Sequence, residues 1–161
     1  MDKPTLAAQR GITMVESLVA LVVLSIGLLG IAGMYVMSLQ TGRTAMLRTQ
    51  AVNLVSDLGD RIRANGSAGI AYDLAAYGGA PAEHACVVVA NCSAAELAED
   101  DLARWLDSVD DTLPTGVNAQ VVFTPAAATG LPDQYRIDLD WREASEDFSY
   151  GSSTFLIAAA P

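Results

Sequence analysis

The chain has 161 residues, 52% of them hydrophobic, and its 19 acidic and 9 basic residues give a net charge of −10. An acidic balance of this size argues against nucleic acid as a partner and against peripheral binding to anionic lipid. Once one long apolar segment near the N-terminus is set aside, the remaining length suffices for a single ordinary domain.

The apolar segment occupies residues 18–37, which contain no charged side chain. As a helix rising about 1.5 Å per residue, it would extend roughly 30 Å, the thickness of the hydrocarbon core of a bilayer. Lys3 and Arg10 precede it and favour a cytoplasmic N-terminus, with the acidic remainder across the membrane. The apolar core is too long for an ordinary secretory signal, and no A-x-A-like site follows it. A plain signal anchor is the simplest alternative, but it does not account for Glu16 at the front edge of the span.

Three glycines recur at every third residue of this segment, at Gly27, Gly30 and Gly33. Small residues allow helices to approach closely within a membrane, which suits a helix that packs among copies of itself. Glycine is also common in membrane spans generally. Both interpretations remain open on the sequence alone.

The residues that lead into the span, from position 10 to position 18, are R-G-I-T-M-V-E-S-L. This pattern resembles the type III signal of type IV pilins and pseudopilins, in which a short basic leader ends in Gly. The resemblance implies cleavage by a prepilin peptidase between Gly11 and Ile12, and N-methylation of Ile12. It also implies a role in subunit assembly for Glu16, the fifth residue of the mature chain. The family more often has Phe at the position of Ile12.

The spacing of this motif has a physical logic of its own. An amine at Ile12 and a carboxylate at Glu16 lie one helical turn apart. In a filament of parallel helices, Glu16 would pair with the amine of a neighbouring subunit, which neutralises both charges and sets the axial stagger. Removing one partner of such a buried pair costs about 3–5 kcal/mol. The alternative is an interfacial glutamate that faces water.

The helix is expected to continue beyond the span, from about Ile12 to Ala64. Residues 38–64 form an amphipathic half, because apolar side chains recur at spacings of four and three, at Leu47, Ala51, Leu54, Leu58 and Ile62. Asn65-Gly66 is a typical helix stop.

Residues 65–92 are rich in Gly, Ala and Tyr and are predicted to form an irregular loop, with a short strand at Val87-Val88-Val89. Cys86 and Cys92 lie within it, with five residues between them. In an exported domain this spacing favours a disulfide, while free thiols, or a metal site completed by carboxylates, are the alternatives. His84, the one histidine, is expected in an exposed part of the loop.

Ser93-Ala94-Ala95-Glu96 is a capping box, and it predicts a helix that Pro114 ends. Its expected buried face consists of Ala98, Leu102, Trp105, Leu106 and Val109. Three acids, Asp100, Asp107 and Asp111, share another side of this helix. They predict a solvated acidic face, with a calcium site as the less favoured alternative.

From Val117 the period changes to two, which predicts strands. The expected strands are 117–124, 134–142 and 154–159, with a turn at 148–151. Residues 134–142 alternate most clearly, with Tyr135, Ile137, Leu139 and Trp141 on one face and charged residues on the other. The predicted fold class is α+β and pilin-like, with a long N-terminal helix packed on a small antiparallel sheet and one extra short helix.

No nucleophile–base arrangement, phosphate-binding loop or metal motif is present in the sequence. A Cys–His nucleophile at His84 and Cys86 is conceivable, but a disulfide would remove it. The chain is therefore predicted not to be an enzyme, and to have no catalytic residues, cofactor, metal or small-molecule substrate.

The later part of the chain carries a second resemblance. The order of blocks is a helix ending R-I-R-A-N, a C-x5-C-S pair, a capped helix with D-L-A-R-W-L, then L-P-x-G-V and Y-R-I-D-L-D-W. This order resembles the PilV-type minor pilins of type IV pili over much of residues 12–142. The resemblance implies a low-abundance subunit that joins other minor pilins, the major pilin and a large tip adhesin. That complex is expected to prime assembly at the inner-membrane platform and to lie at the pilus tip.

The expected organisation is a leader at 1–11, a membrane-spanning and filament-core half-helix at 12–37, an amphipathic half at 38–64 and a periplasmic head at 65–161. The protein would first be a single-pass inner-membrane protein with a cytoplasmic N-terminus, and later part of an extracellular pilus. Two alternatives remain: a minor pseudopilin of a type II secretion system, and a single-span sensor or anchor with a periplasmic ligand-binding head.

Overall fold

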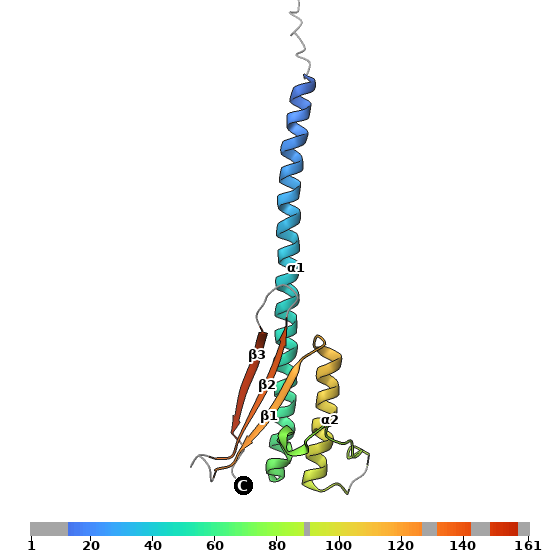
Figure 1. Cartoon of the computed structure of the whole chain (residues 1–161), viewed down its shortest axis with the longest axis vertical. Coiled ribbons are helices and arrows are strands. Elements are labelled where there is room, and N and C mark those ends of the chain that lie inside the picture. Colours follow the sequence, from blue (N-terminus) through green and yellow to red (C-terminus); the bar gives the residue numbers. More distant parts are fainter. Residues whose placement is uncertain (1–12, 89–90, 127–131, 143–148, 158–161) are drawn as a thin grey trace, which may run out of the picture. The chain divides into compact units, whose positions relative to one another are not determined.

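The computed structural model describes residues 13–88, 91–126, 132–142 and, for secondary structure alone, 149–157. The chain divides into two compact units, Met1–Gly42 and Arg43–Pro161. The elements in chain order are α1 (Met14–Ala64), the 3₁₀ helices η1 (Gly66–Tyr72) and η2 (Leu74–Tyr77), α2 (Ala94–Thr112), and the strands β1 (Asn118–Thr124), β2 (Gln134–Arg142) and β3 (Ser149–Ile157) (Figure 1). These elements confirm the predicted α+β class with a long N-terminal helix and one further α-helix.

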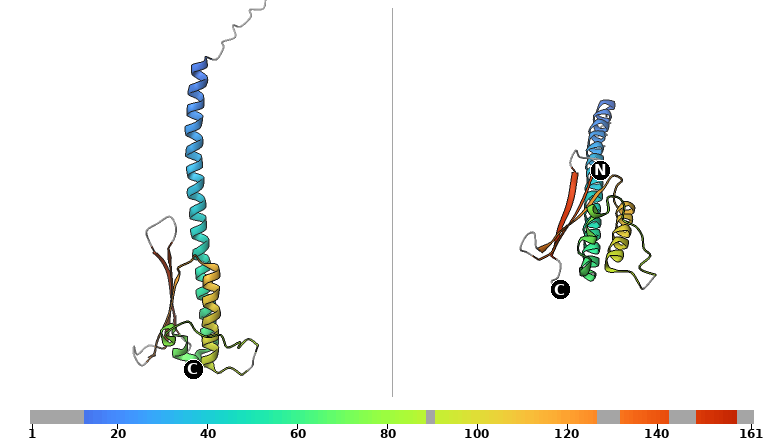
Figure 2. Two further views of the ribbon diagram at one scale, coloured as in Figure 1. Left: turned by 45° about the vertical axis from the view of Figure 1, so that its right-hand side comes forward. Right: turned by 60° about the horizontal axis from the view of Figure 1, so that its bottom comes forward.

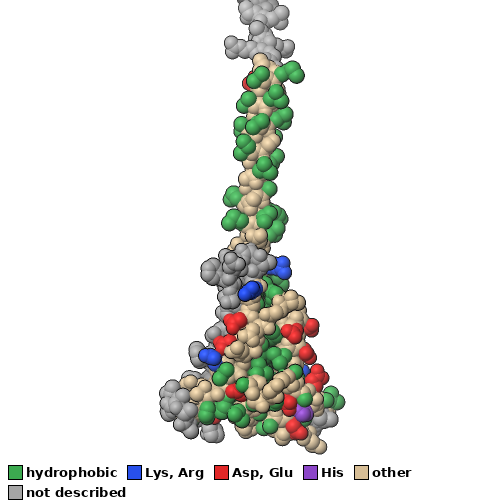
Figure 3. All heavy atoms as spheres, viewed as in Figure 1, with side chains coloured by type: hydrophobic (Ala, Val, Ile, Leu, Met, Phe, Trp, Pro, Cys, Tyr) green, Lys and Arg blue, Asp and Glu red, His purple; other side chains and the backbone are tan. Residues whose placement is uncertain are grey.

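The described part of the first unit is the N-terminal portion of α1. Hydrophobic side chains cover the face of this portion seen in Figure 3. The helix is long and apolar enough to cross a membrane, by length and composition. Two of its hydroxyls bond within the helix, because Ser25 Oγ donates to the Leu21 carbonyl at 2.7 Å and Thr41 Oγ1 donates to the Met37 carbonyl at 3.0 Å. This arrangement suits a helix without water around it.

In the second unit, the C-terminal part of α1 lies between α2 and the sheet (Figures 1 and 2). The predicted amphipathic stripe is largely confirmed, because Ala51, Leu58 and Ile62 are almost completely buried. Leu47 and Leu54 are only partly buried, while Val55, outside the predicted stripe, is 2% exposed. The buried face is wider than one stripe because α1 is covered on two sides.

The sheet has the order β1-β2-β3, and both pairs are antiparallel. Val121 lies opposite Ile137, which in turn lies opposite Thr154. The alternation predicted for β2 is confirmed, with its inward side chains at most 3% exposed: Tyr135, Ile137, Leu139 and Trp141. On the other face, Arg136 Nε lies 2.9 Å from Asp138 Oδ2. β2 is therefore the central strand, and it places its apolar face in the core.

The predicted irregular loop at 65–92 is wrong in its first half, which holds η1 and η2. Tyr72, at the end of η1, is fully buried, and its ring lies edge-on to that of Tyr135 with centroids 6.2 Å apart. Asp73 Oδ1 accepts from the Ala75 amide and Asp73 Oδ2 accepts from the Phe123 amide. The segment is ordered because Tyr72 fills the core and Asp73 joins η2 to the edge of β1.

Two strand predictions also need correction. Cys86, Val87 and Val88 form a turn rather than a strand, and the two valines are 75% and 85% exposed; Val89 lies outside the described residues. The third strand begins at Ser149, so residues 149–151 belong to β3 and do not form the predicted turn. Residues 148, 158 and 159 lie outside the described part of the chain.

Trp105 joins the two helices of the second unit, and its replacement gives a stability prediction. Its side chain is fully buried, and its indole Nε1 donates to the Leu54 carbonyl at 2.9 Å. We expect Trp105→Ala to lower the free energy of unfolding by about 3–5 kcal/mol, because it leaves a cavity and removes the bond between helices. Urea unfolding of the full chain in detergent micelles, followed by circular dichroism, measures this.

The matched control is Val52→Ala on α1, since Val52 is 54% exposed. The free energy of unfolding of Val52→Ala should lie within about 0.5 kcal/mol of that of the unmodified chain. If Trp105→Ala unfolded at the same urea concentration as the control, Trp105 would not be a main contact between the helices.

Candidate subunit-assembly site

The first turn of α1 is fixed by Thr13, which lies immediately before the helix. Thr13 Oγ1 accepts from the Glu16 amide at 3.3 Å, and the Thr13 carbonyl accepts from the Ser17 amide at 3.2 Å. Thr13 is thus an N-cap, and the described helix starts at Met14 rather than at about Ile12. This cap is not among the sequence predictions, although T-x-x-E at 13–16 is the signal of a capping box.

Glu16 lies in the first turn of α1, where the helix dipole favours a negative charge. The residue is exposed, and the neighbouring Met14 and Val15 are 87% and 68% exposed. Gly11 and Ile12 lie outside the described residues, so cleavage between them and methylation of Ile12 stay predictions. The geometry therefore presents a carboxylate beside two exposed apolar side chains on the first turn.

The apolar surface continues along α1 without interruption. The large apolar side chains from Leu18 to Leu39 are each between 53% and 74% exposed. A Cβ added at Gly27, Gly30 or Gly33 would meet nothing within 4 Å. Burying one such large side chain is worth about 1.5–3 kcal/mol, so this helix needs lipid or other apolar helices around it. The glycines leave room for close approach by either.

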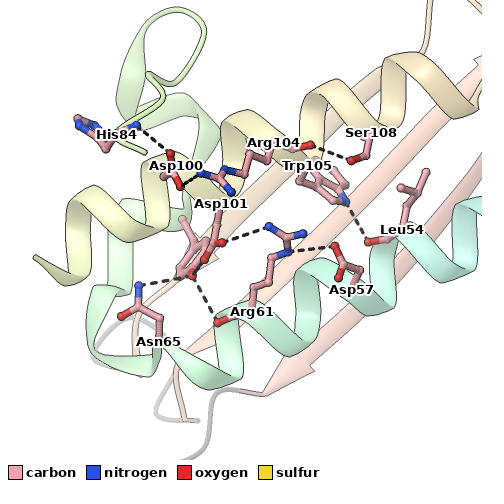
Figure 4. Close-up of polar contacts among 11 residues, drawn as sticks. Leu54, Asp57, Arg61, Asn65, His84, Asp100, Asp101, Arg104, Trp105 and Ser108 are labelled. Carbon is pink, nitrogen blue, oxygen red and sulfur yellow. Dashed lines mark hydrogen bonds and ion pairs between the residues drawn. The ribbon is translucent and has the colours of Figure 1, made fainter. Parts of the chain in front are cut away.

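A polar cluster holds the C-terminal end of α1 against α2 (Figure 4). Arg61 Nη1 lies 3.2 Å from Asp101 Oδ1, and Tyr72 Oη donates to Asp101 Oδ2 at 2.8 Å. Burial, and then the hydrogen bond to Asp101, raises the pKa of Tyr72 far above its usual value of 10.0. Asn65 Nδ2 donates to the Ala94 carbonyl at 2.8 Å. Asn65 is therefore more than the predicted helix stop, because it also ties α1 to the start of α2.

The disulfide between Cys86 and Cys92 is present. It closes a small ring directly before the capping box of α2, which is also present, with Ser93 as the cap and Glu96 bonding back. On the loop-closure model a ring of this size stabilises the fold by about 2 kcal/mol. Among the described residues, no group of three or more His, Cys, Asp or Glu side chains is placed to hold a metal ion.

The predicted acidic face of α2 is wrong for Asp100, which is 1% exposed. Asp100 Oδ1 accepts from the His84 amide at 2.8 Å, and Asp100 Oδ2 lies 2.9 Å from Arg104 Nη2 (Figure 4). The carboxylate can be buried because a cation one turn along α2 and a loop amide both compensate its charge. Asp107 and Asp111 are exposed, as predicted.

Two family descriptions match the chain. Residues 6–32 match the prokaryotic N-terminal methylation motif, and residues 33–103 match the type IV pilin Tt1218 family. The second match includes most of the described elements up to α2. No curated protein and no solved structure matches the chain. Residues 33–103 are therefore similar to a type IV pilin family, and residues 6–32 to the prokaryotic N-terminal methylation motif, and these similarities indicate a component of a pilus or pseudopilus.

Proposed function

We propose that the chain is a minor pilin of a type IV pilus that helps to prime pilus assembly. Prepilin peptidase removes residues 1–11, and the new N-terminus at Ile12 is methylated. The apolar part of α1 anchors the protein in the inner membrane with its head in the periplasm. On assembly the same apolar surface leaves lipid for contact with the helices of other subunits.

The observation that carries this proposal is the exposed carboxylate of Glu16 at the start of an apolar helix, within the segment that matches the methylation motif. A charge at this place is costly in lipid unless it has a partner or a task. The amine of a neighbouring processed subunit is the partner that the motif supplies. Pairing the two removes both charges from the apolar interior of a filament.

The minor role and the partners rest on the resemblance of the later blocks to PilV-type minor pilins. The partners would be other minor pilins, the major pilin, the inner-membrane assembly platform and a large tip adhesin. The final location would be the pilus tip. The second unit, whose sequence has more acidic than basic residues, would select the neighbours.

A minor pseudopilin of a type II secretion system is the second candidate, because the methylation motif implies a pilus or a pseudopilus alike. Deletion of the gene in its own host separates the two. The pilus role predicts loss of surface pili and of twitching motility with secretion intact, and complementation restores both. Loss of protein secretion with normal piliation would instead establish the pseudopilin.

The N-terminus of the chain recovered from membranes tests the shared part of the proposal. Mass spectrometry should find a methylated Ile12 as the first residue. A chain that still begins at Met1 in a host with active prepilin peptidase would favour a single-span anchor over either assembly role.

A further inference from the structure

The loop that precedes the disulfide contacts the side of α2 through one side-chain pair and through hydrogen bonds from two backbone amides. His84 Nε2 lies 2.7 Å from Glu99 Oε2, and the other oxygen of Glu99 accepts from the Ala82 amide at 2.9 Å. The His84 amide donates to Asp100 Oδ1 at 2.8 Å. These contacts join residues 82–84 to one turn of α2, and we call them the His84 strap.

From these contacts we infer that the His84 strap is a pH-sensitive latch, which holds residues 82–84 on α2 in mildly acidic conditions and releases them in alkaline conditions. The inference does not depend on the proposed function, since it concerns contacts within the second unit alone. His84 is the only histidine in the chain, so it is the natural group to titrate between acidic and alkaline conditions.

The charges around His84 fix the direction of the response. Glu96, Glu99 and Asp100 face it from α2, Glu83 adjoins it in the loop, and η2 contributes only the neutral Tyr77, near Glu99. The hydrogen bond to Glu99 is the main cause that raises the pKa of His84 above 6.5. Because the folded-state pKa is raised, the contribution of protonated His84 is complete below pH 6.5 and is lost as the pH rises through the folded value.

Glu99 sets the acidic limit of the same latch. The amide of Ala82, followed by the hydrogen bond from His84, lowers the pKa of Glu99 below 4.5. Its contribution is therefore present above pH 4.5 and is lost as the pH falls through the lowered folded value. The contacts of the latch are strongest in the mildly acidic range, where Glu99 is ionised and His84 is protonated.

The consequence of release is local. Pro81 is buried on one side of the strap, and Cys86 stays bonded to Cys92 beside the cap of α2 on the other. Between them, Ala85 has a φ of 53°, a left-handed conformation that costs a non-glycine residue energy. The strap holds Ala85 in this conformation, so its loss lets the backbone between Pro81 and Cys86 relax without unfolding α2.

Amide exchange of the full chain in detergent micelles, measured by NMR, tests the latch. Between about pH 5.5 and about pH 8.5, on either side of the ordinary imidazole pKa, the protection factors of the Ala82 and His84 amides should fall about threefold. In His84→Gln they should not change over this range. Glu83→Gln is the matched control, because it removes an adjacent exposed charge, and it should behave as the unmodified chain does.

Two results would overturn the latch: a flat protection profile in the unmodified chain, or the same fall in His84→Gln. A second readout does not depend on exchange. The imidazole pKa of His84 should lie above 6.5 in the unmodified chain and move down in Glu99→Gln, while the circular dichroism spectrum of that variant stays unchanged. An unchanged imidazole pKa in Glu99→Gln would show that Glu99 does not hold the latch.

Discussion

Gly11→Leu is expected to leave the protein as an uncleaved precursor that begins at Met1. The cleavage proposed after Gly11 places this residue directly against the peptidase, where a side chain must be accommodated that glycine does not have. A site shaped around glycine rejects a branched side chain by a steric clash, so cleavage should fall by roughly 100-fold or more. A gel shift of the full chain, produced together with an active prepilin peptidase, shows the eleven missing or retained residues directly.

Ala8→Leu is the matched control for this experiment, because it introduces the same side chain three residues before the proposed scissile bond. It should be cleaved at nearly the normal rate. Retained cleavage of Gly11→Leu would place the processing site elsewhere. Mass spectrometry of the product would then show which bond is cut.

The uncleaved precursor should also fail to assemble. It keeps Lys3 and Arg10 ahead of the apolar segment, where basic residues hold the N-terminus at the cytoplasmic surface. It also lacks the amine at Ile12 that the proposed pair with Glu16 requires. The protein should therefore be recovered from the inner membrane and be absent from sheared surface filaments.

Local signals explain which parts of the fold were predictable from the sequence. The cap at Ser93 and Glu96 depends on residues three apart, and the structure has it as predicted. The alternation of β2 is likewise visible within nine residues. In both cases a short stretch contains the full physical reason for its own conformation, so one sequence is enough.

Tyr72 and Asp100 show where prediction from the sequence fails. Tyr72 sits in a Gly- and Ala-rich segment that carries no periodic signal, and its burial follows from contact with Tyr135, 63 positions later in the sequence. Asp100 is an acid on a helix and would be expected to be exposed, but its burial depends in part on the backbone amide of His84, 16 positions earlier. Only the tertiary fold brings these partners together. The exact start of β3 is likewise set by its pairing with β2, and not by a pattern of its own.

In the candidate site, the position of Glu16 was predictable from the sequence, while the cap at Thr13 was not predicted. The place of Glu16 follows from the motif that begins at Arg10, and the structure puts this residue on an exposed first turn. The contact between Thr13 and Glu16 bears on how Glu16 can be tested by substitution. It bonds to the backbone amide of Glu16 and not to its side chain, so the carboxylate can be replaced while the cap remains.

Glu16→Gln is accordingly expected to fold, insert and be processed normally, yet to be incorporated poorly into filaments. The change keeps the size of the side chain and its place on the helix, and it removes only the charge that would neutralise a neighbouring amine. Leaving that amine unpaired in an apolar filament core costs about 3–5 kcal/mol, or a loss of incorporation of roughly 100-fold or more. Immunoblots of sheared filaments against the membrane fraction measure the ratio.

Glu16→Asp and Asp110→Asn decide whether charge and position are both required. Glu16→Asp keeps the charge on a shorter side chain, so it should restore incorporation in part. Asp110→Asn removes an exposed charge from α2 and should incorporate normally, because a general loss of negative charge is not the cause. Normal incorporation of Glu16→Gln would mean that Glu16 faces water at the membrane interface. The apolar surface of α1 alone would then have to set the register between subunits.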